Sequence, residues 1–299
     1  MKKDRIDAFG AAALVGFSLL LAINQVVTKL TYEGIQPVFF AGIRSLGAAL
    51  CIWAFFRLRG RPIRLGQGRV ALAGAICGVV FAFEFMALFL ALDLTNVTRT
   101  SILFYSMPVW TLLIGHFVLG TERITGAAAL GLACAMGGMV LALAERGRQA
   151  ASLAGDLCAI AGAIGWAVTL LIAKHSPLRE LRPEGQLLWQ VLVSAPILLL
   201  LAPFFGPLIR EFEPVHLIGI AFQIVVVVSF GFIFWLWLLS IYPAGGVASF
   251  SFLAPVFSVG LGWLVLGDHL SWRLFAALAL VALGIVLINR RKPLPPPEA

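Results

Sequence analysis

The sequence predicts an all-α integral membrane protein in which ten transmembrane helices form two inverted five-helix repeats around a central cavity. Three observations carry this prediction: a strongly apolar composition, ten apolar runs of membrane-spanning length, and an internal repeat centred on two prolines. Because lipid tails solvate no polar group, the few polar side chains within these runs are the candidates for function.

Composition alone excludes a water-soluble fold. Hydrophobic residues make up 61% of the chain and charged residues 12%, with a mean hydropathy of +1.00. Soluble domains average about 45–50% apolar and about 25% charged residues, so this chain has too little charge to solvate its apolar surface in water. The net charge of +8 does not indicate a nucleic acid partner, because the basic residues cluster in short loops between apolar runs.

Ten apolar runs of about 20 residues are each long enough to cross the roughly 30 Å hydrocarbon core of a bilayer as a helix. The first follows the basic segment MKKDR and is not closed by a small-residue cleavage site, so we expect a retained membrane helix and no cleaved signal peptide. The runs cover residues 9–30, 37–56, 70–92, 97–118, 125–144, 153–173, 185–205, 215–238, 245–266 and 272–289. A short disordered tail, KPLPPPEA, is expected after the last run.

The basic residues are distributed unevenly between the two sides of this bundle. One set of alternate loops, together with the termini, carries 15 of the 22 Lys and Arg residues, and the other set carries 6. Cytoplasmic loops are enriched in Lys and Arg, so both termini are predicted to be cytoplasmic. We expect a multi-pass protein of a bacterial-type inner (plasma) membrane.

Two stretches that begin 147 positions apart repeat one pattern: LFYSMPVWTLLIGHFVLGTE from Leu103 and FSFLAPVFSVGLGWLVLGDH from Phe250. They share six identities without a gap, where composition alone gives roughly one or two. The chain is therefore expected to divide into five-helix halves, 1–149 and 150–299. Because five is odd, the second half is inverted, and such repeats place a solute site near the midplane between the halves.

Pro108 and Pro255 fall about midway along two predicted helices, where a proline removes a backbone hydrogen bond and kinks the chain. We predict that the two kinks face one another and act as hinges for gating. On the faces that carry the prolines, Tyr105, Ser251 and Phe252 are polar or aromatic, unlike a lipid-facing stripe. Close helix packing through small residues is the alternative explanation of these faces.

Polar side chains in two further helices complete the predicted substrate site. The first helix carries Ser18, Asn24 and Gln25, whose polar groups need partners in hydrocarbon and are expected to point to the bundle interior. The sixth carries Trp166 and Thr169 near its centre. These side chains either meet a solute or hold helices together, and core packing alone is an alternative for Trp166.

Arg44 and Glu84 are the charged residues that lie well inside the apolar runs. Their helices run in opposite directions, so both are expected near the bilayer midplane. A buried ion pair is one interpretation. The functional alternatives are binding of a substrate carboxylate by Arg44, binding of a substrate ammonium by Glu84, and proton carriage by Glu84. Lys29 and Lys174, close to helix ends on opposite sides, are expected to reach the interface.

Enzyme signatures are missing from the sequence. It contains no HExxH, no GxSxG, no phosphate-binding glycine loop with lysine and no paired catalytic carboxylates, so we expect no enzyme and no metal or other cofactor. A channel would need a ring of carbonyls or charges, which a single chain of this pattern does not supply unless it oligomerises.

At three kinds of position the sequence resembles the EamA type of the drug/metabolite transporter superfamily. These are the Pro-Val element in each half, the helix ends VLGTE and VLGDH, and the later glycines Gly138 and Gly284. The resemblance covers essentially the whole chain. Family members usually carry Glu after the glycine in both halves, and the second half here departs from that pattern with Asp268 and His269.

The resemblance implies a ten-helix secondary transporter that exports amino acids or related metabolites by alternating access. The aromatic residues of the predicted lining favour amino acids with aromatic or apolar side chains, similar to what the aromatic amino acid exporters of this superfamily would need. A carrier for another small solute, such as a nucleoside or a lipophilic drug, and a channel are the alternatives. The expected partners are a small-molecule substrate and the lipid bilayer, for a monomer or weak homodimer.

Overall fold

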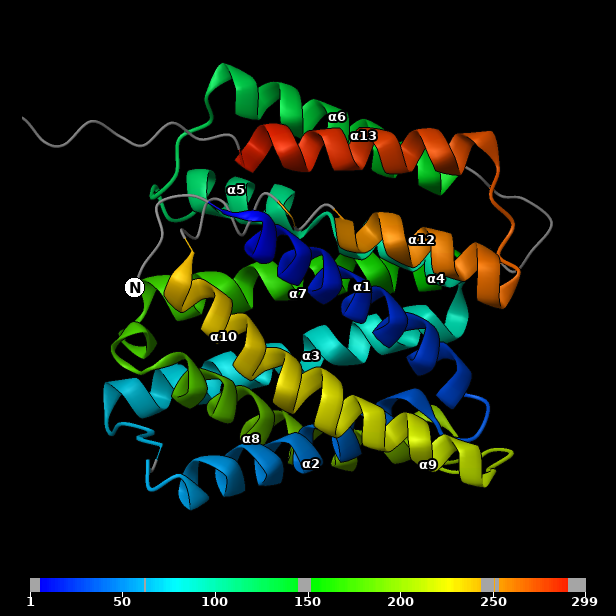
Figure 1. The fold of residues 1–299 in the computed structure, drawn as a ribbon. Helices are drawn as coiled ribbons and strands as arrows, with labels where there is room; N and C mark the ends of the chain where they lie inside the picture. Colours follow the sequence, from blue (N-terminus) through cyan, green and yellow to red (C-terminus); the bar gives the residue numbers. More distant parts are fainter. Residues whose placement is uncertain (1–5, 62, 145–151, 243–249, 251–252, 290–299) are drawn as a thin grey trace, which may run out of the picture.

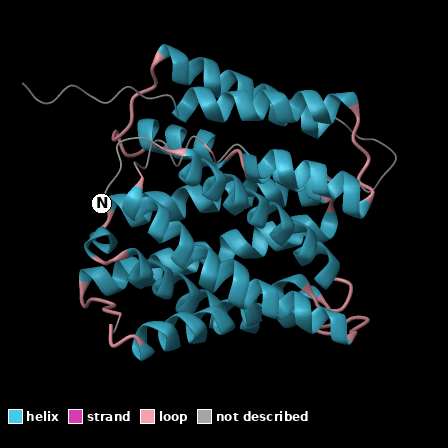
Figure 2. Ribbon diagram, in the orientation of Figure 1, coloured by secondary structure: helices cyan, strands magenta, loops and turns pink. Residues whose placement is uncertain are grey.

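The computed structural model describes residues 6–61, 63–144, 152–242, 250 and 253–289, and every regular element within these ranges is helical (Figure 2). The helices pack into a bundle several layers deep, in which most run along a common direction (Figure 1). An isolated antiparallel bridge joins Ile35 to Ile209 between two loops. The predicted all-α class is confirmed for the described residues.

The helices begin where local sequence signals favour a helix start. In chain order they are α1 (Ala8–Thr31), α2 (Pro37–Leu58), α3 (Arg69–Leu94), α4 (Val97–Phe104), α5 (Met107–Phe117), α6 (Gly126–Ala144), α7 (Leu153–His175), η1 (Pro177–Glu180), α8 (Pro183–Leu201), η2 (Ala202–Phe205), α9 (Pro214–Ala221), η3 (Phe222–Gly231), α10 (Phe232–Ile241), α12 (Leu253–Leu266) and α13 (Trp272–Asn289). Asp7, Asn96 and Ser152 cap α1, α4 and α7 by accepting a backbone N–H. Proline occupies the first turn of α2, α8 and α9, where its missing N–H has no intrahelical partner to lose.

Eight helical stretches of the described chain are long and apolar enough to cross a membrane. They correspond to the first eight predicted runs, with α4 and α5 together forming the fourth and α9, η3 and α10 forming the eighth. Two shorter apolar helices, α12 and the Trp272–Ile288 part of α13, fall on the ninth and tenth runs. The ninth run, 245–266, also includes positions outside the described residues, so ten complete spans stay a prediction.

Helices from the two halves of the chain lie against one another. The main packing pairs are α6 with α13, α2 with α8, α3 with α7, and α1 with α12. Figure 1 shows α6 beside α13 along one edge of the bundle and α2 beside α8 along the opposite edge, with the remaining helices between them. Most of the candidate functional residues therefore lie between two outer helix pairs, while Arg44 lies on α2 itself.

Small residues let α6 and α13 approach until their backbones touch. A Cβ on Gly131 would lie 2.9 Å from the Gly284 carbonyl oxygen, and one on Gly138 would lie 2.7 Å from the Ala277 carbonyl oxygen. Such close contact is the usual basis of helix association in lipid, where burial of apolar surface between helices gives little driving force. The pair has an apolar interface that includes Ala135 and Val281, as expected of a scaffold.

The fourth span is interrupted just before Pro108. Helix α4 ends at Phe104 and α5 begins at Met107, so Pro108 lies in the first turn of a new helix, not in the interior of a kinked one. A proline within a continuous helix would clash with the carbonyl of Phe104, four residues earlier. Ser106 fills the break: its hydroxyl donates to the Leu103 carbonyl oxygen at 2.6 Å and lies 3.2 Å from Trp110 Nε1, which donates to it.

The eighth span contains a π-helical stretch, η3, that the sequence pattern did not predict. Within it the Ser229 hydroxyl donates to the Ile224 carbonyl oxygen, five residues earlier, at 2.8 Å. Gly47 of α2 faces Ile224 so closely that a Cβ there would lie 2.4 Å from its Cδ1. π-Helical turns are rare and occur often at functional sites, and this one adjoins α1 and α2.

The contact between α6 and α13 can be tested with adjacent glycines. Gly138→Leu forces side-chain atoms into the α13 backbone and is expected to lower the free energy of unfolding by about 1–3 kcal/mol. Gly137→Leu is the matched control, because nothing lies within 4 Å of a Cβ at that position. Thermal unfolding of both variants in detergent measures the difference, and equal midpoints would contradict the packing described here.

Candidate functional site

A polar cluster lies where α1, α4 and α12 meet. The Ser101 hydroxyl of α4 lies 2.5 Å from Gln25 Oε1 of α1, to which it donates. The Tyr105 side chain lies beside both Gln25 and Ser258 of α12, and no described residue forms a hydrogen bond of good geometry with the buried Ser258 hydroxyl. Sequence reasoning identified Gln25 and Tyr105 as site residues, and the structure places them together.

Aromatic side chains form a wall next to this cluster. The Trp166 ring of α7 stacks on Phe104 at a centroid distance of 5.1 Å and meets Tyr105 edge-on at 6.1 Å. Tyr105 and Trp166, predicted from different halves of the chain, are therefore direct neighbours. Phe104 was missed, although it adjoins Tyr105 in the sequence. Phe252, the third predicted aromatic residue, and Ser251 lie outside the described residues.

Glu84 binds a hydroxyl on the facing helix. Its Oε2 atom accepts a hydrogen bond from the Thr169 hydroxyl of α7 at 2.8 Å, and both residues are buried. The two helices meet here because Gly165 has no side chain: a Cβ at that position would lie 2.9 Å from the Glu84 Cβ. Thr169, predicted to contact substrate, thus contacts the carboxylate that was predicted to bind an ammonium or carry a proton.

Arg44 points to aromatic rings. Its guanidinium carbon lies 4.5 Å from the centroid of the Phe85 ring and 5.5 Å from that of Phe89, both on α3. An ion pair with Glu84, one of the interpretations that the sequence left open, is not formed in this structure, since their N and O atoms do not come within 4 Å. The physical reason is that Glu84 faces Thr169 of α7 while Arg44 stacks against the next residue along α3.

The other polar residues of α1 pack against η3. The Gln223 side-chain amide donates to the Thr28 hydroxyl at 2.6 Å and to the Asn24 carbonyl oxygen at 3.2 Å, while the Oδ1 of Asn24 and Oε1 of Gln223 have no partner. The Ser18 hydroxyl donates to the Leu14 carbonyl oxygen at 2.9 Å. Gln223 was missed, although it is a lone amide in an apolar run, the same signal that identified Gln25.

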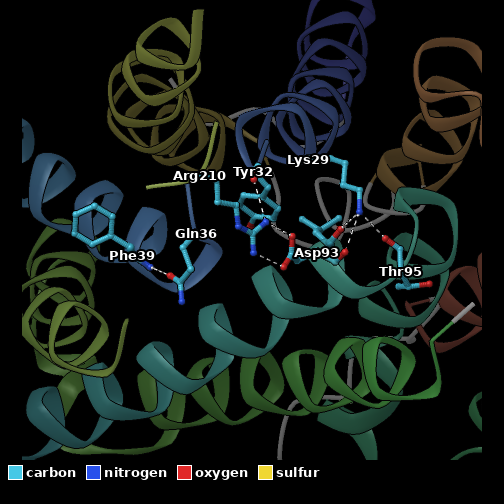
Figure 3. A network of polar contacts seen from close by, with 8 residues as sticks. Lys29, Tyr32, Gln36, Phe39, Asp93, Thr95 and Arg210 are labelled. Carbon is cyan, nitrogen blue, oxygen red and sulfur yellow. Dashed lines mark hydrogen bonds and ion pairs between the residues drawn. The ribbon is translucent and has the colours of Figure 1, made fainter. Parts of the chain in front are cut away.

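Charged residues close one end of the bundle, here named the Lys29 end (Figure 3). The Lys29 ammonium donates to the Leu92 carbonyl oxygen at 2.5 Å and to the Thr95 carbonyl oxygen at 2.9 Å, where α3 ends. Cations are favoured at helix C-termini. Lys29 was expected to reach the membrane interface, and in the structure its ammonium binds carbonyl groups of the protein.

Arg210, in the loop before α9, joins the same end of the bundle. Its two terminal nitrogens lie 2.8 and 2.9 Å from the two Asp93 carboxylate oxygens, and Nη1 also donates to the Tyr32 carbonyl oxygen at 3.0 Å (Figure 3). The hydrogen bonds that Arg210 donates to Asp93 raise the pKa of Arg210 above its ordinary value.

Two more links cross between the halves at the Lys29 end. Arg99 of α4 and Asp156 of α7 form an ion pair that is almost completely buried, with Nε 3.0 Å from Oδ1. The Asp268 Oδ2 atom accepts the backbone N–H of Thr98 at 2.9 Å. The ion pair was missed because each residue lies near a predicted helix end, yet the predicted topology already placed both on the same side of the membrane.

The loop with Asp268 has a counterpart at the opposite end, here named the Glu122 end. Each follows a VLG helix end, with Gly120 and Gly267 at φ angles of 65° and 68°. The Glu122 Oε1 atom pairs with Lys174 Nζ at 3.4 Å, and the Lys174 side chain is 60% exposed. The two equivalent turns therefore differ: the one at the Lys29 end carries a buried acid, and the one at the Glu122 end carries a solvated ion pair.

A membrane bundle whose interior holds a glutamate, an arginine, amides and stacked aromatic rings is the architecture of a solute transporter. Comparison with known sequences identifies the family to which the chain belongs. The chain belongs to the EamA-like transporter family, of the drug/metabolite transporter superfamily, because the family model matches residues 8–144 and again residues 153–290. The prediction of an EamA-type membrane transporter is confirmed at this level.

Several relatives resemble the chain over most of its length. YoaV of Bacillus subtilis, an uncharacterized transporter, is 20% identical over 93% of this chain and 97% of that protein. The uncharacterized PA1977 of Pseudomonas aeruginosa is 29% identical over 85% and 84%, and YedA of Escherichia coli K12, an uncharacterized inner membrane transporter, is 22% identical over 97% and 93%. A solved crystal structure matches 93% of this chain and 96% of its own, with a TM-score of 0.64 and 22% identity, and so shares the fold.

The buried ion pair can be tested by removing one partner. Asp156→Asn leaves the Arg99 guanidinium without its counter-charge, and the expected loss in the free energy of unfolding is about 3–5 kcal/mol. Lys174→Met, which breaks the solvated pair at the opposite end, is the control and is expected to change stability by less than about 1 kcal/mol. Chemical denaturation in detergent compares the free energies of unfolding of the two variants. An Asp156→Asn variant as stable as the wild type would contradict a structural role for the ion pair.

Proposed function

We propose that the protein is a secondary transporter that exports amino acids with aromatic or apolar side chains across the inner membrane by alternating access. The two halves, 1–149 and 150–299, would be inverted repeats that rock against one another. The two separate matches of the family model support this division, as do the reciprocal packing pairs α2 with α8 and α6 with α13.

One observation carries the proposal: buried polar and aromatic side chains from both halves meet in the middle of the bundle. Gln25 and Tyr105 come from the first half, and Trp166 and Ser258 from the second. Polar groups are costly in a hydrocarbon environment, and tight apolar packing would serve a purely structural protein better. A site built this way loses or gains hydrogen bonds when the halves move.

Each predicted residue takes a role in this site. Tyr105 and Trp166 would contact the apolar or aromatic side chain of the substrate, as a flat wall. The hydrogen-bonding set for the α-amino and carboxyl groups would comprise Ser18, Asn24, Gln25 and Thr169. Ser251 and Phe252 are proposed for the same two roles on sequence grounds alone.

The prolines fit a hinge role. Pro108 follows the break between α4 and α5, and Pro255 lies three residues into α12 counted from Leu253. The Tyr105 N–H still bonds the Ser101 carbonyl oxygen, but the Ser106 N–H bonds that of Leu103, three residues earlier, so the regular helical pattern stops here. Such an interrupted backbone costs less to bend than a continuous helix. Tyr105 lies in this break itself, so movement of the hinge would move a site residue.

The unequal ends of the bundle fit a transporter caught in one state. The Lys29 end is held by buried links between the halves, Arg99 with Asp156 and Asp268 with Thr98. At the Glu122 end, the pair between Glu122 and Lys174 is solvated. With both termini cytoplasmic, the Lys29 end would face away from the cytoplasm and be the closed side.

Counterflow in proteoliposomes tests the function directly. Vesicles loaded with an unlabelled amino acid are expected to accumulate labelled phenylalanine transiently, with competition by tryptophan and leucine. Folded protein that shows no flux of any amino acid would refute the substrate class. Flux that neither saturates nor exchanges would favour a channel, and exchange of nucleosides or lipophilic drugs alone would favour the alternative carriers.

Trp166 provides a sharper test within the same assay. Trp166→Ala removes the stacked wall, and the half-saturating concentration for phenylalanine is expected to rise about 10-fold, while that for alanine changes little. Trp272→Ala is the control, since the Trp272 side chain is 74% exposed at the start of α13. Equal changes in the half-saturating concentration for phenylalanine in the two variants would contradict a role of Trp166 in substrate binding.

A further inference from the structure

Arg44 is a buried cation without a counter-charge. The residue is only 8% exposed, its Nε atom is fully enclosed without an acceptor, and no residue of the described chain forms a hydrogen bond or ion pair with its guanidinium. The contacts that remain are the Phe85 and Phe89 rings. A ring face stabilises the plane of a guanidinium but accepts none of the N–H groups along its edge.

Two other arginines of this chain show what a structural role looks like. Arg99 is fully buried and is paired with Asp156 through both Nε and a terminal nitrogen. Arg210, which is partly exposed, binds both oxygens of Asp93. Arg44 lies well inside α2, whereas Arg99 is near the start of α4 and Arg210 is in a loop. No carboxylate of the described residues pairs with Arg44. Burial of a charge without a partner is strongly unfavourable, so a structural role for Arg44 does not explain why its acceptors are missing.

A second unpartnered donor lies next to Arg44. The Tyr32 hydroxyl has no hydrogen-bond partner among the residues that the structure describes, although Tyr32 is only 2% exposed. Its ring packs edge-on against Phe89 at a centroid distance of 5.9 Å, and Phe89 is also the ring that lies 5.5 Å from the Arg44 guanidinium carbon. Two buried donors without acceptors therefore lie against one phenylalanine.

We propose that Arg44 and Tyr32 form an anion subsite that binds the carboxylate of the transported solute. The planar guanidinium edge presents paired N–H groups that match the two oxygens of a carboxylate, and the tyrosine hydroxyl adds a third donor. The aromatic rings of Phe85 and Phe89 hold the guanidinium in place while the subsite is empty. This inference rests on the proposed function, because it names the substrate group that the site receives.

Glu84 narrows the substrate class further. It is buried on α3, one residue before Phe85, and only one of its two oxygens accepts a hydrogen bond from the described residues. A free anion at Arg44 would be repelled by this carboxylate, whereas a solute that also carries an ammonium group would be attracted by it. The pair of opposite, separated charges therefore fits an α-amino acid zwitterion better than a simple organic acid.

The test compares an amino acid with its amide, because the amide keeps the ammonium and the side chain but lacks the carboxylate. Phenylalanine and leucine, each with its amide, are titrated against the detergent-purified full chain, and affinity is read from ligand-induced stabilisation against heat. The wild type is expected to bind each acid about 10- to 100-fold more tightly than its amide. Arg44→Gln is expected to abolish this preference without weakening the amides.

Control variants separate the subsite from general damage to the fold. Arg57→Gln removes an exposed arginine from the end of the same helix and is expected to keep the preference for the acids. Tyr32→Phe is expected to reduce the preference several-fold, because it deletes one neutral donor and leaves the ring packing intact. If Arg44→Gln does not fold, Arg44→Lys and Tyr32→Phe are used in its place. A lysine lacks the paired N–H groups of the guanidinium edge but keeps the positive charge.

Two results would overturn the inference: a wild type that binds the acids and amides equally, and an Arg44→Gln variant that still prefers the acids. The counterflow assay decides the proposed function separately. Amino acid exchange that is insensitive to Arg44→Gln would leave the function standing and refute the subsite. Acid-selective binding that depends on Arg44, in a protein with no amino acid flux, would leave the subsite standing and refute the proposed function.

Discussion

The structure depends on one constraint: lipid supplies no hydrogen bonds, so every polar group within the spans needs a partner inside the protein. The chain meets this constraint in different ways along its length. At the Lys29 end, charged groups pair with one another or with helix termini, as in the buried pair of Arg99 with Asp156. Farther from that end, Glu84 has one hydroxyl partner, and Arg44 and Ser258 keep atoms without a partner among the described residues, as Tyr32 does at the Lys29 end itself. Satisfied groups hold the bundle together, and unsatisfied ones define the proposed site.

Glycine and proline decide where the helices can approach and where they can bend. The contacts of Gly138 and Gly284 join α6 and α13 backbone to backbone, which makes this pair a rigid support. The break ahead of Pro108 places Tyr105 outside regular helix, next to the polar cluster. Rigid outer pairs and an interrupted inner helix are the mechanical parts that a rocking motion requires. The buried links at the Lys29 end would then be made and broken once in each cycle.

Hydrophobicity predicted the helices well, because span length is set by the bilayer: the runs 37–56 and 153–173 became α2, Pro37–Leu58, and α7, Leu153–His175. The internal repeat also placed Tyr105 and Trp166 in one predicted cavity. The break before Pro108, the π-helix η3 and the partners of Arg44 and Glu84 were not predictable in this way. Each depends on which helices pack against one another, and the hydrophobic pattern of a single helix does not indicate its neighbours. Ser251 and Phe252 stay predictions.

Distances between spin labels at the two ends of the bundle test alternating access most directly. One label pair would occupy Glu33 and His269 at the Lys29 end and a second pair Arg123 and His175 at the Glu122 end, all four exposed, in a background without the native cysteines. Pulsed electron paramagnetic resonance in nanodiscs, with and without phenylalanine, reads both distances. The account predicts opposite changes, one end opening as the other closes. Distances that stay fixed at both ends, or that lengthen together, would contradict it.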